Sequence, residues 1–312
     1  MKQFKTYRMG VPALRTWMPG LLLAGLLGCW PAVQGATQGP AQLRYPLTSD
    51  GVDSRYDYDW AVLRAALEKT APRFGAFELR PSDAPMSPQR ITQEMQTPAG
   101  RINIFVRATS PALEHDLLPV RLPIDRGLLG YRVFLVRAAD LPRFAKVRTL
   151  DDLRRLRAGQ GKGWADVSIL TAAGIPVVEG STYEGLFAML DEGRFDFFSR
   201  SLDEALREFD ERHASHPQEA IETTLLLHYP LPRYFFLRRD AEGQQLAKRI
   251  VAGMEMMLRD GSLNALFYHY KGGIIERAGL KGRRVLTLAN PTLTPETPLQ
   301  RRELWYEPLS GK

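Results

Sequence analysis

The part of this chain that most constrains its fold is the block of residues 149–198. It starts with a short helix signal, passes through a glycine-rich turn at residues 159–163, and then alternates two helical segments with two apolar strand segments. An alternating βαβαβ order implies parallel strands joined by right-handed crossover helices. The glycine-rich turn opens onto a helix, where backbone N–H groups can face a ligand. A block of this size is smaller than an ordinary domain and predicts the centre of a larger α/β lobe.

Length and charge set limits on the class of protein. A chain of 312 residues favours two domains, and its 44% hydrophobic and 25% charged content is ordinary for a soluble globular protein. Four basic residues and no acid lie in residues 1–36, so the net charge of +7 falls to +3 without that segment. Such a mild excess gives little support to nucleic-acid binding, and we expect no nucleic-acid partner.

Residues 1–36 have the pattern of an export signal. Basic residues precede an apolar run at 21–30 that is too short to span a bilayer, and the small residues Gly35 and Ala36 follow it. We expect cleavage near Ala36. Two alternatives stay open. Residues 26–29 (LLGC) resemble a lipobox, which would anchor the protein through a lipid on Cys29. In the other alternative, the segment is not cleaved and anchors the protein itself.

Catalytic and metal-binding signatures are absent from the sequence patterns. Cys29 is the only cysteine, which excludes a disulfide within the chain, a cysteine metal site and thiol catalysis. His213 and His216 are three residues apart, but in a polar stretch without a third ligand, and the other histidines show no ligand spacing. No G-x-S-x-G, Ser-x-x-Lys or phosphate-loop pattern occurs. We therefore predict no metal, no cofactor and no catalytic residue.

The remaining elements follow from periodicity. Trp60, Leu63, Ala66 and Leu67 fall at helical spacing within residues 58–69, and the apolar run 102–106 is suited to a buried parallel strand. Beyond residue 281 we expect irregular chain whose Trp305 and Tyr306 pack on the body. The other predicted elements are strands at 43–47, 74–79, 117–124, 130–137, 221–227 and 233–238, a loop at 81–88, and helices at 89–96, 202–213, 242–260 and 263–270.

Five segments resemble one known family. Residues 149–153 read TLDDL, similar to the s-x-x-D-L that opens the second lobe of type II periplasmic solute-binding proteins. Residues 159–163 (GQGKG) resemble the family's strand and turn V-G-V-Q-x-G, and residues 183–198 resemble its ealeaLaaGrvDAvv. Residues 234–240 (YFFLRRD) resemble its strand returning to the first lobe, and residues 252–271 resemble its terminal aLaelkadGtlakIyekw. The similarity covers roughly residues 43–275, as in a divergent member of family 3 of the extracellular, amino-acid-binding-like solute-binding proteins.

This resemblance implies an α/β fold of the periplasmic binding protein-like type II class, with two α/β lobes, a discontinuous first lobe and an inter-lobe cleft. Lobe 1 would comprise residues 43–136 plus 230–305 and lobe 2 residues 137–229, with crossings near 134–139 and 227–233. The implied function is that of a monomeric periplasmic protein. It would capture a small molecule between the lobes for an ABC permease or a membrane sensor. Closure of two lobes around a ligand is a hinge motion that needs no catalytic group.

The chain departs from the family where amino-acid ligands are held. The family carries an arginine for the ligand carboxylate after its lobe-one strand, but residues 107–115 have no arginine after the proline. The family's acid for the ligand amine falls near Ser201, and its small hydroxyl residue after the glycine-rich turn is replaced by Trp164. We therefore expect a bulkier or aromatic ligand, or none, in place of a standard α-amino acid.

Candidate ligand-binding residues lie at predicted strand ends and turns. Arg107 follows a buried strand, where it would bind a carboxylate or phosphate, or form a structural ion pair. Trp164 would stack on a ligand ring or cation, or pack on the lobe surface. Asp166, two residues on, is interpreted as a residue that caps or favours the helix start. The full candidate set is Tyr45, Tyr56, Arg107, Thr109, Lys162, Trp164, Tyr183 and Arg200.

Two other functions remain open. The first is a degenerate family member that acts as a regulatory protein-interaction module, which a filled cleft would favour. The second is an enzyme on the same fold, a dehydratase or a peptidoglycan lyase. An enzyme needs an acid or base in the cleft, and a carboxylate there with a strongly raised pKa would favour it.

Overall fold

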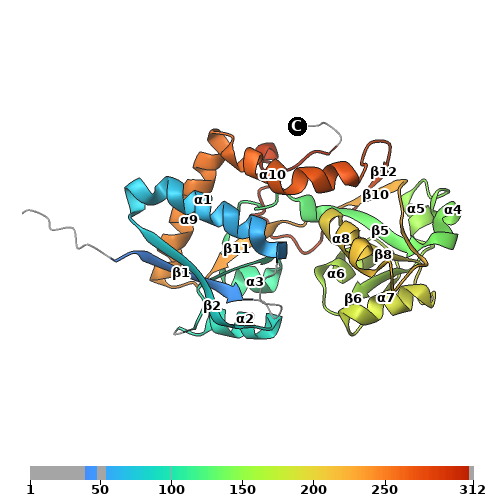
Figure 1. Cartoon of the computed structure of the whole chain (residues 1–312), viewed down its shortest axis with the longest axis horizontal. Helices are drawn as coiled ribbons and strands as arrows, with labels where there is room; N and C mark the ends of the chain where they lie inside the picture. Colours follow the sequence, from blue (N-terminus) through green and yellow to red (C-terminus); the bar gives the residue numbers. More distant parts are fainter. Residues whose placement is uncertain (1–38, 48–53, 99, 309–312) are drawn as a thin grey trace, which may run out of the picture. The chain divides into compact units, whose positions relative to one another are not determined.

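The computed structural model describes residues 39–47, 54–98 and 100–308 (Figure 1). The expected export signal, the lipobox at Cys29 and the cleavage point near Ala36 lie outside the described residues. Within them, every helix is too short or too polar to cross a membrane.

A seven-stranded sheet contains the central block. Its order is β12-β10-β5-β8-β6-β7, and β9 also pairs with β5. Strands β6, β7 and β8 run parallel, as the βαβ pattern predicted, whereas β5 runs antiparallel to β8. The bounds are β5 (Tyr131–Arg137), β6 (Ala158–Gly161), β7 (Val177–Gly180), β8 (Phe197–Ser201), β9 (Glu219–Ile221), β10 (Leu225–His228) and β12 (Arg284–Thr287).

Helices fill the connections of this sheet. A capping box opens α5, with the Thr149 hydroxyl accepting from the Asp152 amide at 3.2 Å and the Asp152 carboxylate accepting from the Thr149 amide at 3.0 Å. The predicted helix at 202–213 is also present, as α8, and it packs against β5 and β8. The bounds are α4 (Leu141–Phe144), α5 (Leu150–Leu153), α6 (Ala165–Ala172), α7 (Tyr183–Asp191) and α8 (Leu202–Arg212).

Two predictions about strands near this sheet are wrong. The single strand expected at 221–227 is divided into β9 and β10, because the Glu222 carboxylate accepts hydrogen bonds from the amides of Thr224 (2.7 Å) and Leu225 (2.8 Å) and turns the chain. The irregular chain expected beyond residue 281 contains β12, which pairs with β10 in parallel.

Two smaller sheets complete the strands. β1 (Ala41–Leu47) pairs with β2 (Phe77–Pro85) in parallel, and β11 (Arg233–Leu237) lies between β3 (Ile104–Ala108) and β4 (Leu118–Val120). The parallel strand predicted at 102–106 is wrong in its direction, because β3 pairs only antiparallel, with β11. The loop expected at 81–88 is also wrong, since β2 continues past Pro81 and the Ser82 hydroxyl accepts from the Leu47 amide at 3.0 Å.

Long helices pack beside the smaller sheets (Figure 1). α1 (Asp57–Phe74) lies so close to α9 (Ala241–Arg259) that a Cβ on Gly253 would meet the Ala66 carbonyl oxygen at 2.2 Å. α10 (Ser262–Arg277) runs past the predicted end at 270 because Ile274 and Ile275 pack on the core, and it also contacts α8. The short helices are α2 (Pro88–Gln96) and α3 (Pro111–Asp116).

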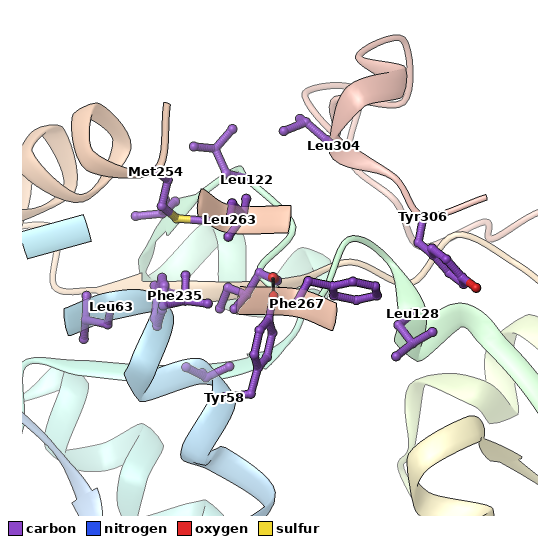
Figure 2. Packing of buried hydrophobic residues seen from close by; sticks show 14 of the residues in the cluster. Tyr58, Leu63, Leu122, Leu128, Phe235, Met254, Leu263, Phe267, Leu304 and Tyr306 are labelled. Atoms are coloured by element: carbon purple, nitrogen blue, oxygen red, sulfur yellow. Dashed lines mark hydrogen bonds between the residues drawn. The ribbon is translucent and has the colours of Figure 1, made fainter. Parts of the chain in front are cut away.

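The C-terminal segment packs into the core, as predicted from its aromatic residues. Figure 2 shows Phe267 of α10 directed toward Tyr306, and the two ring centroids are 5.5 Å apart. The Tyr131 hydroxyl donates to the Tyr306 carbonyl oxygen at 2.8 Å, and the Tyr306 amide donates to the Arg126 carbonyl oxygen at 2.7 Å. These bonds attach the segment to both ends of the turn that precedes β5.

The chain passes between the seven-stranded and the three-stranded sheet at residues 121–130, between β4 and β5, and at residues 229–232, between β10 and β11. It passes a third time through α9 and α10, between β11 and β12. The second passage lies within the range expected for a crossing. The first does not, because residues 131–137 form β5 inside the seven-stranded sheet. The limits of the two lobes remain a prediction, and the pairing of β5 favours a first lobe that ends before residue 131.

Candidate functional site

A cavity of about 960 Å³ lies where the carboxyl ends of β3, β6, β7 and β8 meet the starts of β5 and β11. Ligands of open α/β sheets sit at such strand ends, and this volume is within the range of small-molecule sites. Six arginines and four carboxylates are among the described residues that line it. They are Arg55, Arg107, Arg132, Arg200, Arg207, Arg233, Asp166, Glu179, Glu204 and Glu208.

The glycine-rich turn sets the position of Trp164 on the cavity wall. Gly163 has a φ of 79°, which favours glycine, and Trp164 then starts α6 as its N-cap residue. The indole ring lies over Gly161, where a Cβ would meet it at 2.3 Å. β6 must therefore end in a residue without a side chain for the ring to pack there.

An ion pair supports the same ring from the sheet side. Arg200, at the end of β8, donates from Nε to Glu208 Oε2 at 2.8 Å and from Nη2 to Glu208 Oε1 at 2.6 Å. Its guanidinium lies 4.8 Å from the centroid of the Trp164 ring, and the Tyr183 hydroxyl donates to Glu208 at 2.9 Å. Burial lowers the pKa of Arg200, but Glu204 and Glu208 outweigh burial and raise it. Arg200 is thus held by protein groups.

A second buried arginine is held in the same way. Arg132, at the start of β5, donates to the Tyr229 hydroxyl at 2.9 Å and to the Asp166 carboxylate at 2.5 Å, and Tyr229 also donates to Asp166. A capping role for Asp166 is therefore wrong, whereas its position in the first turn of α6 agrees with the expectation that it favours the helix start. Trp164 is the N-cap residue and has no side-chain capping bond, while the Asp166 carboxylate bonds to residues of β5 and of the passage after β10.

The arginine at the end of β3 has different surroundings. Arg107 Nη1 donates to the Thr92 hydroxyl at 3.5 Å, and its guanidinium lies 5.1 Å from the centroid of the Phe105 ring. Burial lowers the pKa of Arg107, and Tyr56 acts in the opposite direction. Thr109, two residues on, uses its hydroxyl hydrogen in a bond to Glu114 at 2.5 Å and its amide in a bond to the Pro232 carbonyl oxygen at 2.9 Å. The Thr109 hydroxyl oxygen can therefore accept a hydrogen bond from a ligand, but Thr109 has no free hydrogen to donate.

A smaller cavity of about 110 Å³ adjoins the first and shares Tyr56, Glu204 and Arg233 with it. Two buried carboxylates line it, those of Asp59 and Asp125, and Asp59 of α1 is 2% exposed and lies 2.7 Å from Arg233 Nη2. Burial raises the pKa of Asp59 to about 6, against the opposing effect of Arg233. This is the kind of carboxylate that an acid–base role requires.

Comparison with solved structures identifies the fold. The chain is similar to an ancestral arginine-binding protein bound to arginine, with 16% identity and a TM-score of 0.50 over 75% of this chain and 98% of that one. It is also similar to the ancestral amino acid-binding protein AncCDT-1, a precursor of cyclohexadienyl dehydratase, with 14% identity and a TM-score of 0.50 over 74% and 94% of the two chains.

The chain has the type II periplasmic binding protein fold. This confirms the fold class expected from the sequence. No protein-family model and no curated protein sequence matches the chain. The likeness at these identities is one of fold, so the site must be argued from its own residues.

Within this fold, six of the eight candidate residues line the main cavity, namely Tyr56, Arg107, Thr109, Trp164, Tyr183 and Arg200. The other two are not brought to it. Tyr45 stacks on Trp60 with ring centroids 4.3 Å apart, and Lys162 is exposed on the solvent side of the turn before Gly163. That the six residues contact a ligand remains a prediction.

Sequence reasoning missed several charged residues of the cavity, above all Arg132, Arg233 and Glu208. Arg132 and Arg233 each occur at the start of a run of apolar residues that forms a buried strand, in YRVFLV and RYFFL. A single charge at the start of such a run was the available signal, because a buried charge requires a partner. Glu208 had no comparable signal, since it lies among other charges on α8.

Proposed function

We propose that this protein is a periplasmic solute-binding protein that holds a small molecule in the main cavity and delivers it to an ABC transporter or a membrane sensor. The observation that carries this proposal is the cavity itself, with its volume of about 960 Å³ and its wall of arginine and aromatic side chains. The fold it shares with an arginine-binding protein supports the proposal.

The proposed ligand carries an anionic group. Arg132 and Arg200 are bound by Asp166 and Glu208, so their charges are largely balanced within the protein. Burial lowers the pKa of Arg107, so a ligand carboxylate or phosphate beside it would stabilise its charged form. Arginine binds such groups through two parallel hydrogen bonds, and we assign Arg107 this role.

The same ligand has a flat, apolar body. The rings of Tyr56, Trp164 and Tyr183 line the cavity, and each is partly exposed. A ligand ammonium group is less suited to the site, because Asp166, Glu204 and Glu208 already bind arginines. Aromatic or other cyclic acids fit this wall better than ordinary amino acids do.

A thermal-shift screen tests the proposal. The purified protein is heated with millimolar aromatic carboxylates, aromatic phosphates, amino acids, polyamines or sugars, because a ligand that binds the folded state raises the melting temperature. Hits are then titrated by calorimetry against the wild type, Arg107→Gln and the control Lys162→Gln. We expect an aromatic anion to bind, with about 10-fold or greater loss in Arg107→Gln and no change in Lys162→Gln. No shift with any class would contradict the proposal and favour the protein-interaction module.

Asp59 supports a second candidate, an enzyme on the same fold. It lies beside the cavity with a pKa of about 6, and one similar structure is described as the precursor of a dehydratase. An elimination of water or cleavage of a glycosidic bond would need such an acid. Turnover of a hydroxylated cyclic acid or of peptidoglycan by the wild type, and its loss in Asp59→Asn, would establish this function. If a compound from the screen binds but is never converted, the enzyme function is ruled out for that compound.

A further inference from the structure

Three potential metal ligands meet at the edge of the seven-stranded sheet that lies away from the cavity. Asp191 ends α7, His216 lies in the connection from α8 to β9, and Glu219 is the first residue of β9. Glu219 pairs with Arg137 at the end of β5, whereas Arg132 of the cavity wall lies near its start. Five residues of strand separate the two positions by about 16 Å. The cluster is therefore distinct from the main cavity.

The ligand atoms of the cluster lie close together. One atom each from Asp191, His216 and Glu219 lies within 4.8 Å of the other two, and His216 Nδ1 is 2.5 Å from Asp191 Oδ2. The sequence pattern offered only His213 and His216, without a third ligand. The fold supplies Asp191 from 25 residues upstream and Glu219 from three residues downstream.

Glu219 gives the independent sign that something is bound here. Its side chain is 2% exposed, and within the described chain neither carboxylate oxygen has a hydrogen-bond partner. Asp191 Oδ1 is likewise buried without a hydrogen bond among the described residues. A buried carboxylate without partners is strongly destabilising, so native proteins pair such groups or use them to coordinate metals.

Arg212, whose charge acts on the Glu219 carboxylate, pairs with other acids instead. Arg212 binds Glu184 at 2.6 Å and Glu211 at 3.3 Å, and its guanidinium lies 4.7 Å from the centroid of the Phe187 ring. Among the residues described, no ion pair joins Arg212 to Glu219. A cation that sits between Asp191, His216 and Glu219 would satisfy the unpartnered oxygens.

We propose that Asp191, His216 and Glu219 bind one zinc ion. One imidazole nitrogen and two carboxylate oxygens suit zinc, whereas magnesium and calcium prefer oxygen ligands alone. Two ionised carboxylates and a neutral imidazole balance the charge of a divalent ion. In a tetrahedral zinc site, ligand atoms lie about 3.3 Å apart. Zinc binding would therefore lengthen the 2.5 Å distance between His216 Nδ1 and Asp191 Oδ2 and bring the Glu219 carboxylate closer to both. The side chains of Asp191 and His216 are 24% and 21% exposed, which leaves room for a water as the fourth ligand.

Such an ion would connect three segments of the seven-stranded sheet and its helices. It would tie the end of α7 to the α8–β9 connection and to the first residue of β9. Because no group of the main cavity takes part, zinc binding and solute binding are separate properties, and failure of one leaves the other standing.

Calorimetric titration tests the proposal. The chelator-treated protein is titrated with zinc chloride, and we expect one ion per chain with a dissociation constant below about 10 μM. His216→Ala should weaken binding by at least about 100-fold, since loss of even an outer-shell partner weakens metal binding 10- to 100-fold. The matched control is His213→Ala, which removes the other histidine of the same connection and should bind as the wild type does.

A spectroscopic measurement keeps the test independent of variant folding. Cobalt(II) added to the wild-type protein should give visible absorption bands of a low-symmetry site, and zinc should remove them. Glu219→Gln, which is close in shape, should abolish the bands. Absence of one-to-one zinc binding, equal affinity in His216→Ala and His213→Ala, or an unchanged cobalt spectrum in Glu219→Gln would each overturn the proposal.

Discussion

Arg200 and Glu208 form a bidentate ion pair at the end of β8, and the Trp164 ring lies against the arginine of that pair. Glu208 is fully buried and Arg200 is 7% exposed, so neither charge is solvated by bulk water. The pair therefore fixes the position of one aromatic wall of the cavity. In the proposed function this pair places Trp164, and Arg107 is the residue proposed to meet the ligand charge.

Removal of one charge from this pair should destabilise the protein. Glu208→Gln removes the bidentate partner of the buried Arg200 and leaves only Glu204, at 3.4 Å, to balance its charge, so we expect the free energy of unfolding to fall by about 3 kcal/mol. Urea unfolding at neutral pH measures the change. The control is Glu211→Gln on the same helix, which breaks only exposed pairs to Arg207 and Arg212 and should change stability by less than about 0.5 kcal/mol. Equal losses of unfolding free energy in the two variants would show that the buried pair stabilises the protein no more than an exposed pair does.

Gly161 and Gly273 form a matched pair of glycines. A Cβ at Gly161 would lie 2.3 Å from the Trp164 ring, so Gly161→Ala should displace the indole, lower the unfolding free energy by about 2 kcal/mol and shift the tryptophan fluorescence. Gly273, inside α10, has open space around its Cα. Gly273→Ala should raise stability by about 0.8 kcal/mol, because alanine favours helix more than glycine does. A stable Gly161→Ala protein with unchanged fluorescence would be inconsistent with the position of the ring.

The sequence predicted those parts of the fold that local patterns determine. The short helix signal at residue 149, the amphipathic spacing of Leu63 and Leu67, and the alternation of helix and strand within residues 149–198 all specify structure over short distances. The positions of Arg107 and Trp164 on the cavity wall followed from the same reasoning, because strand ends and glycine-rich turns meet at one edge of a sheet.

The errors concern partners that lie far apart in sequence. An apolar run such as 102–106 has the same composition whether its neighbour is parallel or antiparallel, and its partner β11 lies more than a hundred residues away. Asp166 has the position of a helix cap in the sequence, but Arg132 and Tyr229 approach from other elements and bind its carboxylate. Local reasoning could not anticipate these contacts, because only the tertiary fold brings the groups together.

His228 should make stability depend on pH. Burial lowers the pKa of His228 to about 4, below the ordinary value of 6.5, and its ring stacks on Tyr131 at 4.2 Å. The neutral ring therefore contributes stability above pH 6.5 that is lost as the pH falls through 4. Between pH 7 and 4 the wild type should lose about 2 kcal/mol more than His228→Gln, as measured by urea unfolding. His269→Gln removes an exposed histidine and should follow the wild type. Parallel curves for wild type and His228→Gln would contradict this.

Trp164 should contribute to ligand affinity through its ring. For any ligand found in the screen, Trp164→Ala should weaken binding about 10-fold in calorimetry, because the stacking face is lost. The control is Trp305→Phe, because the Trp305 indole donates to the Pro298 carbonyl oxygen at 3.0 Å and does not line the main cavity, and this variant should leave affinity unchanged. A ligand that binds Trp164→Ala as tightly as the wild type does not stack on this ring.

The main cavity is proposed to bind an anionic solute between Arg107 and Trp164. A crystal structure of the protein with the tightest ligand from the screen tests it most directly. We predict density for the ligand in the cavity, with its carboxylate or phosphate oxygens within about 3 Å of the Arg107 guanidinium and its ring against Trp164. Density at another site, or a ligand in the cavity whose charged group lies away from Arg107, would contradict the account.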